Sequence, residues 1–312
     1  MNVAFYVFPD FQLLDLSGPL AAFQAVGLGI TPCPYRLYVL SEQGGEIRSS
    51  SGVAITTQSV DAVEPDTLLI VGGRGVMHIR RASSEAERLR SLCLSASRFG
   101  SICTGAFVLA ETGLLKGKKA TTHWRAVERF RKAWPDVLMD GEPLFVRDGN
   151  IWTSAGTTSG IDLALAMIEA DLGRDISRQV AQELVVYQRR PGGQSQFSPM
   201  LQLEPASSRI SSVLSYIQAH LSEDLDVTRL AEVACLSVRQ FSRQFKNETG
   251  KTPGRAVEHL RIDAARALLE SGADSVAQIA RRTGFGHPER MRRAFLRYLG
   301  RPPQAYRMYH RE

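Results

Sequence analysis

The chain has 312 residues, with 38 Lys and Arg against 32 Asp and Glu, which gives a net charge of +6 at pH 7. This length predicts two domains of ordinary size. The sequence has neither an apolar span long enough to cross a bilayer nor a charged leader followed by an apolar run. This argues against a membrane or secreted protein and predicts a soluble, cytoplasmic one.

The four cysteines are Cys33, Cys93, Cys103 and Cys235, and they follow no metal-binding spacing. We therefore expect no metal site, no cofactor and no disulfide framework. Isolated cysteines are mostly buried and inert, so Cys33, Cys93 and Cys235 are predicted to be core residues.

The basic charge is concentrated toward the C-terminus. Residues 206–312 carry 18 Lys and Arg against 11 Asp and Glu, whereas the preceding 205 residues carry 20 against 21. Binding to phosphate groups needs such an excess, so the distribution favours a nucleic-acid partner for the C-terminal part.

The first 188 residues alternate apolar strands with helical segments. Strands are expected at 2–8, 35–40, 67–71, 100–102, 144–146 and 151–154, and helices at 13–26, 84–98, 160–172 and 177–186, with one more from Cys103 to near Gly113. Alternation of this kind predicts a mostly parallel sheet covered by helices. We therefore expect an α/β sandwich, flavodoxin-like in class, over residues 1–188.

Cys103 stands where a strand is expected to turn directly into a helix. Such a turn lifts the side chain out of the sheet, and the start of the helix lowers the pKa of a thiol. The N–H of Thr104, with a second N–H from Gly72-Gly73, would then form an oxyanion hole. The alternative is that Cys103 only fills the core.

Two further side chains are candidates for chemistry with Cys103. His123 is the candidate base, and Asp15 is an acid at an otherwise apolar helix start. Asp15 has the alternative role of capping its helix. Trp124, next to His123, is predicted either to pack in the core or to form the wall of a ligand pocket.

Residues 189–206 break every periodicity and are rich in Pro, Gly and Ser. They are predicted to connect the two domains, with Phe197 and Leu201 as candidate anchors.

Residues 207–312 contain an internal repeat. The segment 230–245 recurs as 279–295, offset by 49 at Ala231/Ala280 and by 50 at Phe245/Phe295. Each copy is predicted to be a short helix, a turn and a second helix, which makes an all-α domain with two helix-turn-helix motifs. The helix expected at 255–270 would be a strut of about 24 Å, able to place two recognition helices about one DNA turn, roughly 34 Å, apart.

The second helix of the first copy leaves Arg239, Ser242, Arg243 and Lys246 on the face opposite its phenylalanines. Arginine suits both phosphate and the O6/N7 edge of guanine, so this face is predicted to enter the major groove. The alternative is an ordinary helical bundle with a solvated basic face.

The second copy resembles the signature of the AraC family of transcription regulators, in Ile279-Ala280, Gly284-Phe285, Phe295 and Gly300-Arg301-Pro302-Pro303 followed by Tyr306-Arg307. The resemblance covers about the last hundred residues and implies reading of double-stranded DNA. His287-Pro288 opens the second recognition helix where the family usually has small polar residues, and proline is acceptable in a first helical turn. The implied DNA-binding residues are Arg239, Gln240, Ser242, Arg243, Lys246, Glu289, Arg290, Arg292 and Arg293.

Residues 1–187 resemble the ThiJ/PfpI branch of the class I glutamine-amidotransferase-like fold. The resemblance rests on Leu14-Asp15-Leu16-Ser17-Gly18-Pro19, Gly72-Gly73, Ile102-Cys103-Thr104-Gly105, Thr121-Thr122-His123-Trp124 and Thr153-Ser154-Ala155-Gly156. It implies that the catalytic candidates are Cys103 as nucleophile, His123 as its partner and Asp15 beside the thiol. The implied ligand-binding residues are Asp15, Gly73, Cys103, Thr104, His123, Trp124 and Gly156.

The two domains together resemble the GlxA-like group of bacterial regulators, in which the first domain senses a metabolite rather than turning it over. This implies a homodimeric transcription regulator, with activation favoured, a small nitrogenous metabolite as effector and RNA polymerase as a candidate partner. Two alternatives stay open: a cysteine-dependent hydrolase or hydratase, and a redox sensor that acts through oxidation of Cys103.

Overall fold

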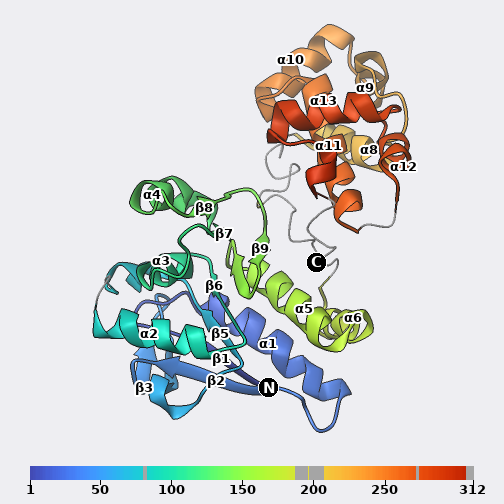
Figure 1. Cartoon of the computed structure of the whole chain (residues 1–312). Helices are drawn as coiled ribbons and strands as arrows, with labels where there is room; N and C mark the ends of the chain where they lie inside the picture. Colours follow the sequence, from blue (N-terminus) through green and yellow to red (C-terminus); the bar gives the residue numbers. More distant parts are fainter. Residues whose placement is uncertain (80–82, 187–195, 197–206, 272–273, 307–312) are drawn as a thin grey trace. The chain divides into compact units, whose positions relative to one another are not determined.

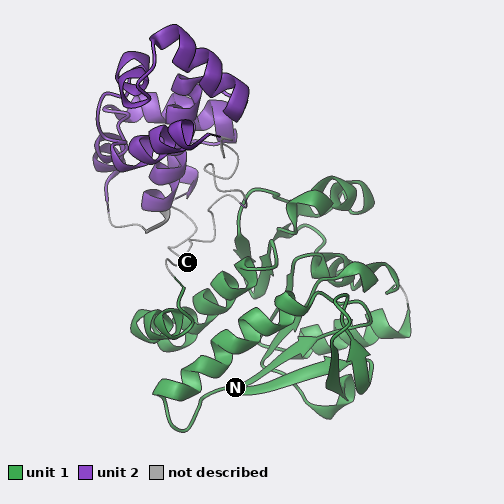
Figure 2. Cartoon of the chain, turned by 180° about the vertical axis from the view of Figure 1, so that it is seen from behind, with its two compact units in different colours: residues 1–192 green, residues 193–312 purple. Residues whose placement is uncertain are grey.

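The structure is a computed structural model, and it describes residues 1–79, 83–186, 196, 207–271 and 274–306. The chain divides into two compact units, residues 1–192 and 193–312 (Figure 2). The predicted connection at 189–206 lies, apart from Gln196, outside the described residues. No helix in the described ranges is long and apolar enough to cross a lipid bilayer.

Unit 1 is built on an eight-stranded sheet with the order β3-β4-β2-β1-β5-β6-β10-β9. The six inner strands are parallel, and the two edge strands, β3 and β9, run antiparallel to their neighbours. The strands are β1 (Asn2–Tyr6), β2 (Arg36–Ser41), β3 (Gln43–Arg48), β4 (Ala54–Ser59), β5 (Thr67–Ile70), β6 (Arg98–Ile102), β9 (Phe145–Asp148) and β10 (Ile151–Ser154). The expected mostly parallel sheet is thus confirmed.

Helices cover both faces of this sheet (Figure 1). Across the sheet, the step from β1 to β2 runs toward the β3 edge, and the step from β5 to β6 runs toward the β9 edge. Because both crossovers are right-handed, α1 and α2 lie on opposite faces of the sheet. Helices α1, α5 and α6 pack against one another, and α3 packs on β5 and β6. Their bounds are α1 (Leu13–Gly29), α2 (Ser84–Ser95), α3 (Gly105–Glu111), α5 (Ser159–Leu172) and α6 (Arg174–Glu183).

The sequence prediction differs from the structure in three places in unit 1. Arg98, expected at the end of a helix, and Phe99, expected in no element, both lie in β6, because Phe99 is a core residue that pairs with Leu68 of β5. The edge hairpin β3–β4 was not predicted, since its exposed, polar strands lack apolar alternation. Also unpredicted were β7 (Lys119–Ala120), α4 (Val127–Ala133) and β8 (Leu138–Met139), which are short and therefore show little periodicity.

The cysteine prediction is partly wrong. Cys93 and Cys103 are buried, but Cys33 and Cys235 are exposed. Cys235 has a φ of +52° because it forms the tight turn between two helices of unit 2, and this turn holds it at the surface.

Unit 2 is all-helical and confirms the repeat. The first motif is α9 (Val227–Val233) and α10 (Val238–Thr249), and the second is α12 (Val276–Arg282) and α13 (Pro288–Leu299). Each second helix ends at a left-handed glycine, Gly250 or Gly300. The unit also contains α8 (Ser208–Ala219), α11 (Pro253–Ser271) and a short turn, η4 (Pro303–Tyr306). The one-residue difference in offset lies in the turn, where the second motif has two positive-φ glycines, Gly284 and Gly286.

Candidate functional site

Cys103 forms the turn between β6 and α3 and has a φ of +57°, a conformation that costs a non-glycine residue energy. Its N–H donates to the Ser154 carbonyl at 2.9 Å, and its own carbonyl accepts from the Thr122 hydroxyl at 2.8 Å. These two bonds tie the turn to the segments that follow β7 and end β10. The structure therefore places Cys103 on the strained strand-to-helix turn that the sequence indicates.

Two glycines let the backbone close around this side chain. A Cβ built on Gly156, whose φ is +90°, would lie 2.0 Å from the Cys103 Cβ and 2.7 Å from its sulfur. A Cβ on Gly72 would lie 2.7 Å from the Cys103 Cβ and 2.6 Å from a carboxylate oxygen of Asp15. Neither position has room for a side chain, so glycine is required at both.

Asp15 lies in the first turn of α1 and is fully buried. Its Oδ1 accepts from the Thr157 N–H at 2.7 Å and its Oδ2 from the Gly72 N–H at 3.2 Å. The carboxyl group also hydrogen-bonds the Cys103 thiol. The N-cap residue of α1 is Gln12, so a capping role for Asp15 is wrong. The carboxylate instead joins three segments that are distant in the sequence.

Burial governs the protonation of this pair. Desolvation raises the pKa of Asp15 to about 6, although its hydrogen bonds to Thr157, Cys103 and Gly72 lower it. Burial first, and then the Asp15 charge, raise the pKa of the Cys103 thiol well above its usual range. Hydrogen bonds from Thr104 lower the pKa but do not outweigh burial, so the prediction of a lowered thiol pKa is wrong. The thiol is protonated at neutral pH.

The backbone donors expected to form an oxyanion hole already have partners inside the protein. The Gly72 N–H donates to Asp15, and the Gly73 N–H donates to the Thr104 hydroxyl at 2.9 Å. A hydrogen bond from the Thr104 N–H acts on the Cys103 sulfur. A substrate oxygen would have to displace these partners, which contradicts the expectation of open donors.

His123 begins the short turn η3 (Trp124–Ala126), one residue after Thr122. Its Nδ1 accepts from the Arg125 N–H at 3.3 Å. Burial, followed by the charge of Arg125, lowers the pKa of the imidazole, so the ring is neutral at pH 7. The thiol is thus hydrogen-bonded to Asp15, whereas the His123 ring is held by its own turn.

Trp124 is 39% exposed, so of its two predicted roles the core role is wrong. Its ring stacks on His123 with centroids 5.6 Å apart, and the Arg125 guanidinium lies 4.8 Å from its centroid. Trp124 therefore offers a partly exposed aromatic surface beside the candidate base.

Sequence reasoning missed Thr122 and Thr157, which orient Cys103 and Asp15 respectively. The available signal was weak: both are small polar residues next to motif residues, and Thr157 directly follows Gly156, a turn glycine with a positive φ. Within the described ranges, no cluster of three or more His, Cys, Asp or Glu side chains suits a metal ion.

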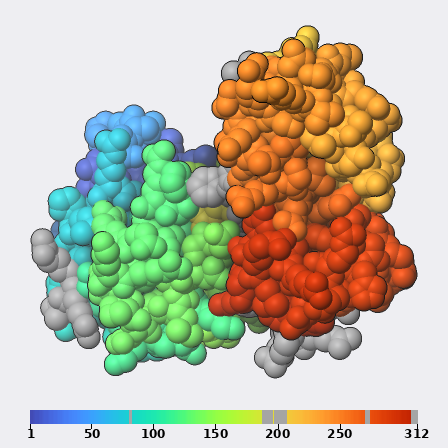
Figure 3. All heavy atoms as spheres, turned by 90° about the horizontal axis from the view of Figure 1, so that it is seen from above, coloured from blue at the N-terminus to red at the C-terminus, as the bar shows by residue number. Residues whose placement is uncertain are grey.

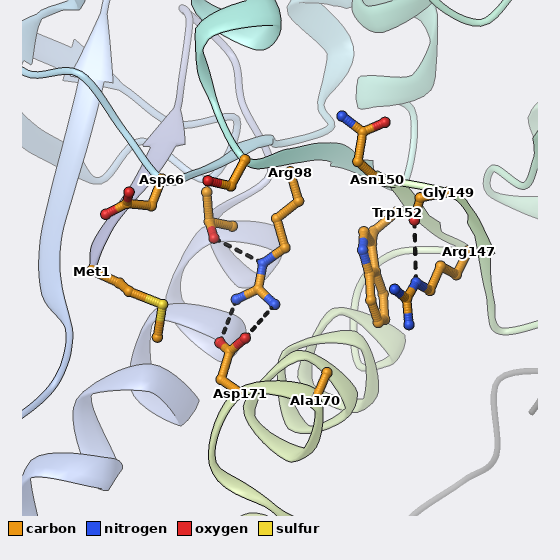
Figure 4. A pocket seen from close by; sticks show the side chains of 11 residues that line it. Met1, Asp66, Arg98, Arg147, Gly149, Asn150, Trp152, Ala170 and Asp171 are labelled. Atoms are coloured by element: carbon orange, nitrogen blue, oxygen red, sulfur yellow. Dashed lines mark hydrogen bonds and ion pairs between the residues drawn. The ribbon is translucent and has the colours of Figure 1, made fainter. Parts of the chain in front are cut away.

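A cavity of about 460 Å³ lies at the opposite, amino-terminal ends of the strands (Figure 4). The Arg98 guanidinium binds both carboxylate oxygens of Asp171 and also Thr67, and Tyr35 donates to Asp171 at 2.7 Å. Arg147 lies over the Trp152 ring. The ion pair at the centre of this cavity is satisfied within the protein and joins α5 to the sheet. We therefore describe the cavity as a structural contact and not as a reaction site.

In unit 2, the first recognition helix α10 buries Phe241 and Phe245. It exposes Arg239, Arg243 and Lys246 and leaves Ser242 half-buried. Gln240 has a structural role, because its side-chain carbonyl accepts from the backbone N–H of the N-cap residue Ser237 at 3.4 Å, while its own N–H donates to the Ser237 hydroxyl at 3.4 Å. These two bonds form a capping box. The basic face opposite the core thus consists of the two arginines and the lysine.

The second recognition helix α13 buries Met291 and Phe295. It exposes Arg290, Arg292 and Arg293. Glu289 accepts from Arg292 at 3.1 Å and lies 3.7 Å from Arg293, so it partly neutralises this face. The His287 ring caps the helix by accepting from the Glu289 N–H, and Pro288 occupies its first turn, as expected.

Comparison with known proteins agrees with both halves of this description. The DJ-1/PfpI family profile matches residues 1–170, and a helix-turn-helix domain profile matches residues 230–309. A ThiJ/PfpI family protein from Pseudomonas syringae has the same fold, with a TM-score of 0.54, 20% identity and coverage of 80% of this chain and 89% of that chain.

Three curated relatives match between 59% and 98% of this chain. The chain is 34% identical to the HTH-type transcriptional regulator CdhR of Pseudomonas aeruginosa, over 86% of this chain and 81% of that protein. It is 28% identical to the regulator GlxA of Rhizobium meliloti, over 98% and 95%, and 31% identical to an isonitrile hydratase of Pseudomonas putida, over 59% and 78%. The chain therefore belongs to the DJ-1/PfpI family, in the group of HTH-type transcriptional regulators that carry an AraC-type helix-turn-helix domain after it.

Proposed function

We propose that this chain is a sequence-specific transcription regulator that reads double-stranded DNA with α10 and α13. The observation that carries the proposal is the pair of helices that share a left-handed glycine at the C-terminal end, a buried apolar face and outward arginines. Arg239, Arg243 and Lys246 supply the first set of contacts, and Arg290, Arg292 and Arg293 the second. Residues 1–188 would be the sensor domain, 189–206 the connection and 207–312 the DNA-binding domain, acting in the cytoplasm as a homodimer.

The sensor site would lie at the carboxyl ends of the strands, above Cys103. In open α/β sheets, ligands bind where the strand order reverses, and here this point lies between β1 and β5. Asp15 follows β1 and Gly72-Gly73 follow β5, so the residues around the thiol surround this point. The remaining expected contacts are Thr104, His123, Trp124 and Gly156. A small nitrogenous metabolite is the proposed effector, and it would shift the orientation of the DNA-binding domains.

Sensing without turnover is supported by the state of the site. The raised pKa of the thiol leaves it protonated, and the neighbouring N–H groups are hydrogen-bonded within the protein. A sensor needs the pocket but not an activated nucleophile. The similarity to an isonitrile hydratase supports a second candidate function, a cysteine-dependent hydratase in which ligand binding would displace these partners.

DNA binding is tested by gel shift of the full chain on an operator selected from random-sequence duplexes. Arg243→Ala is expected to weaken binding, because a base contact is worth about 1–3 kcal/mol. The matched control is Arg178→Ala, which removes the same charge from an exposed position in unit 1. If the two variants bind equally well, α10 does not read the groove.

The effector is tested by thermal shift of the full chain against amino acids and quaternary amines. A ligand at 100 times its dissociation constant adds about 2.7 kcal/mol of stability, which is readily measured. A compound that stabilises the protein and stays chemically unchanged supports the sensor. A compound that is consumed, with activity lost in Cys103→Ala, supports the hydratase instead, and operator release by peroxide with oxidised Cys103 supports a redox sensor.

A further inference from the structure

The two helix-turn-helix motifs have separate apolar cores. One cluster of buried side chains includes Phe241 and Phe245 and reaches α11 at Leu260, and the other includes Phe295 and begins on α11 at Ile262. In the space-filling view the first motif (yellow to orange) and the second (red) form adjacent parts of the unit (Figure 3). The angle between α10 and α13 is therefore not set by one shared core, and α11 contacts helices of both motifs.

A single helix does not fix this angle completely, because long helices bend gently along their length. Three side chains of α11 make further contacts that constrain it. Glu258 forms an ion pair with Arg297 of α13. His259 has its Nδ1 3.0 Å from the ammonium of Lys251, just after α10, and its ring stacks on Tyr298 of α13 at 6.0 Å with an interplanar angle of 14°.

His259 therefore lies between the C-terminal ends of both recognition helices. Burial, and then the charge of Lys251, lower the pKa of His259 to about 4. At neutral pH the ring is uncharged, so its Nδ1 accepts from the Lys251 ammonium while its face stacks on Tyr298. One side chain of α11 thus contacts both Lys251, just after the first motif, and Tyr298 of the second motif.

Arg261 makes the third contact. Its guanidinium donates to the Leu221 carbonyl at 3.0 Å and to the Glu223 carbonyl at 2.6 Å, both in the loop that precedes the first motif. The same group packs against the turn of the second motif, where a Cβ built on Gly284 would lie 2.6 Å from Arg261 Nε and 1.9 Å from the Leu221 carbonyl oxygen. The loop before the first motif and the turn of the second are thus in direct contact, with Arg261 beside them.

We propose that Glu258, His259 and Arg261 are positioning residues that fix the angle and separation of α10 and α13. They make no proposed contact with DNA. They hold the two recognition helices in the one arrangement that matches successive major-groove segments, so that the second motif binds without having to be oriented first. This inference rests on the proposed function, because it requires that both helices bind DNA.

The test measures how the affinity for DNA depends on the spacing between the two contacted segments. The full chain selects an operator from random duplexes, and footprinting locates the two contacted segments. Binding is then measured on this operator, on copies with one base pair inserted or deleted between the segments, and on a duplex that keeps only the first segment. Arg261→Met removes the donors and keeps an apolar side chain of similar length, and Arg255→Met, at an exposed position on the same helix, is the matched control.

The wild type and Arg255→Met should lose at least about fivefold in affinity when the spacing changes, comparable to the loss of one base contact. Arg261→Met should bind the selected operator more weakly but discriminate much less between spacings, with unchanged affinity for the single segment. Unchanged spacing discrimination, or an equal loss on the single segment, overturns the proposal.

A second variant keeps the test valid if Arg261→Met does not fold. Glu258→Gln removes the charge that pairs with Arg297 and keeps a side-chain oxygen for the hydrogen bond with Tyr298. Thermal unfolding verifies that this variant is folded. It should show the same loss of spacing discrimination to a smaller extent, and unchanged discrimination would again overturn the proposal. Failure of the proposed function gives a different result: Arg243→Ala then binds the operator as tightly as the wild type.

Discussion

The thiol of Cys103 hydrogen-bonds the carboxyl group of Asp15, and both groups are buried where parallel strands end. A negative carboxylate beside a buried thiol opposes formation of the thiolate, which is the reactive form of cysteine. The pair therefore does not activate the thiol as a nucleophile, unless a ligand changes the environment of the thiol.

The first prediction concerns the reactivity of Cys103. Iodoacetamide should label it slowly near neutral pH, whereas exposed Cys33 in the same protein is the internal reference. Asp15→Asn keeps the side-chain volume and removes the charge, so labelling of Cys103 should accelerate by up to about tenfold for each unit that its pKa falls. Peptide-resolved mass spectrometry measures both rates. Labelling of wild-type Cys103 as fast as Cys33 would contradict a protonated, buried thiol.

The second prediction concerns stability and pH. Asp15 has a pKa of about 6 in the folded protein, above its ordinary value of 3.8, so the folded state binds its proton more tightly. Its contribution to the free energy of unfolding is therefore fully present below about pH 4 and is lost as the pH rises through about 6. The loss is roughly 3 kcal/mol, because each unit of pKa difference between the folded and unfolded states is worth about 1.4 kcal/mol.

Urea denaturation between these pH values measures this contribution. The wild type should lose stability relative to Asp15→Asn as the pH rises, and the comparison cancels the other carboxylates, which titrate in both proteins. A difference between the two proteins that does not change with pH would show that Asp15 keeps its ordinary pKa after folding.

The third prediction concerns the closeness of Gly156 to the thiol. Gly117 also has a positive φ, +72°, but a Cβ there would meet nothing within 4 Å. Gly117→Ala should therefore cost only the backbone strain, about 1–2 kcal/mol. Gly156→Ala adds a collision with Cys103, so it should cost about 1–3 kcal/mol more. Chemical denaturation compares the two variants, and equal losses would mean that the turn at Cys103 moves aside freely.

The fourth prediction tests the separation of the two cores in unit 2. Phe295→Ala should destabilise the second motif by about 3–5 kcal/mol, because it empties the centre of that cluster. Leu296→Ala, at a neighbouring exposed position, is the control. In hydrogen exchange, amides of α12 and α13 should lose protection while those of α9 and α10 keep theirs. Equal loss in both motifs would indicate a single cooperative core.

Much of the architecture was predictable from local patterns. Helical periodicity and the repeat located both motifs, because the apolar residues of an amphipathic helix recur at the spacing of its buried face. The turn at Cys103 was also visible, since a tight strand-to-helix turn needs small residues on either side and the sequence has them there. The edge hairpin β3–β4 was not, because an exposed edge strand buries too little for its sequence to alternate.

The sequence by itself determined the alternation of the main strands and helices in unit 1, the two motifs of unit 2 and the identity of the residues at the strand ends. Only the tertiary structure decided their relationships: that the Cys103 thiol pairs with Asp15 and not with His123, that the backbone donors near it are already bonded, and that Gln240 caps its own helix. The reason is physical. Periodicity reports which face of an element is buried, whereas protonation and hydrogen bonding depend on desolvation and on partners brought together from distant parts of the chain.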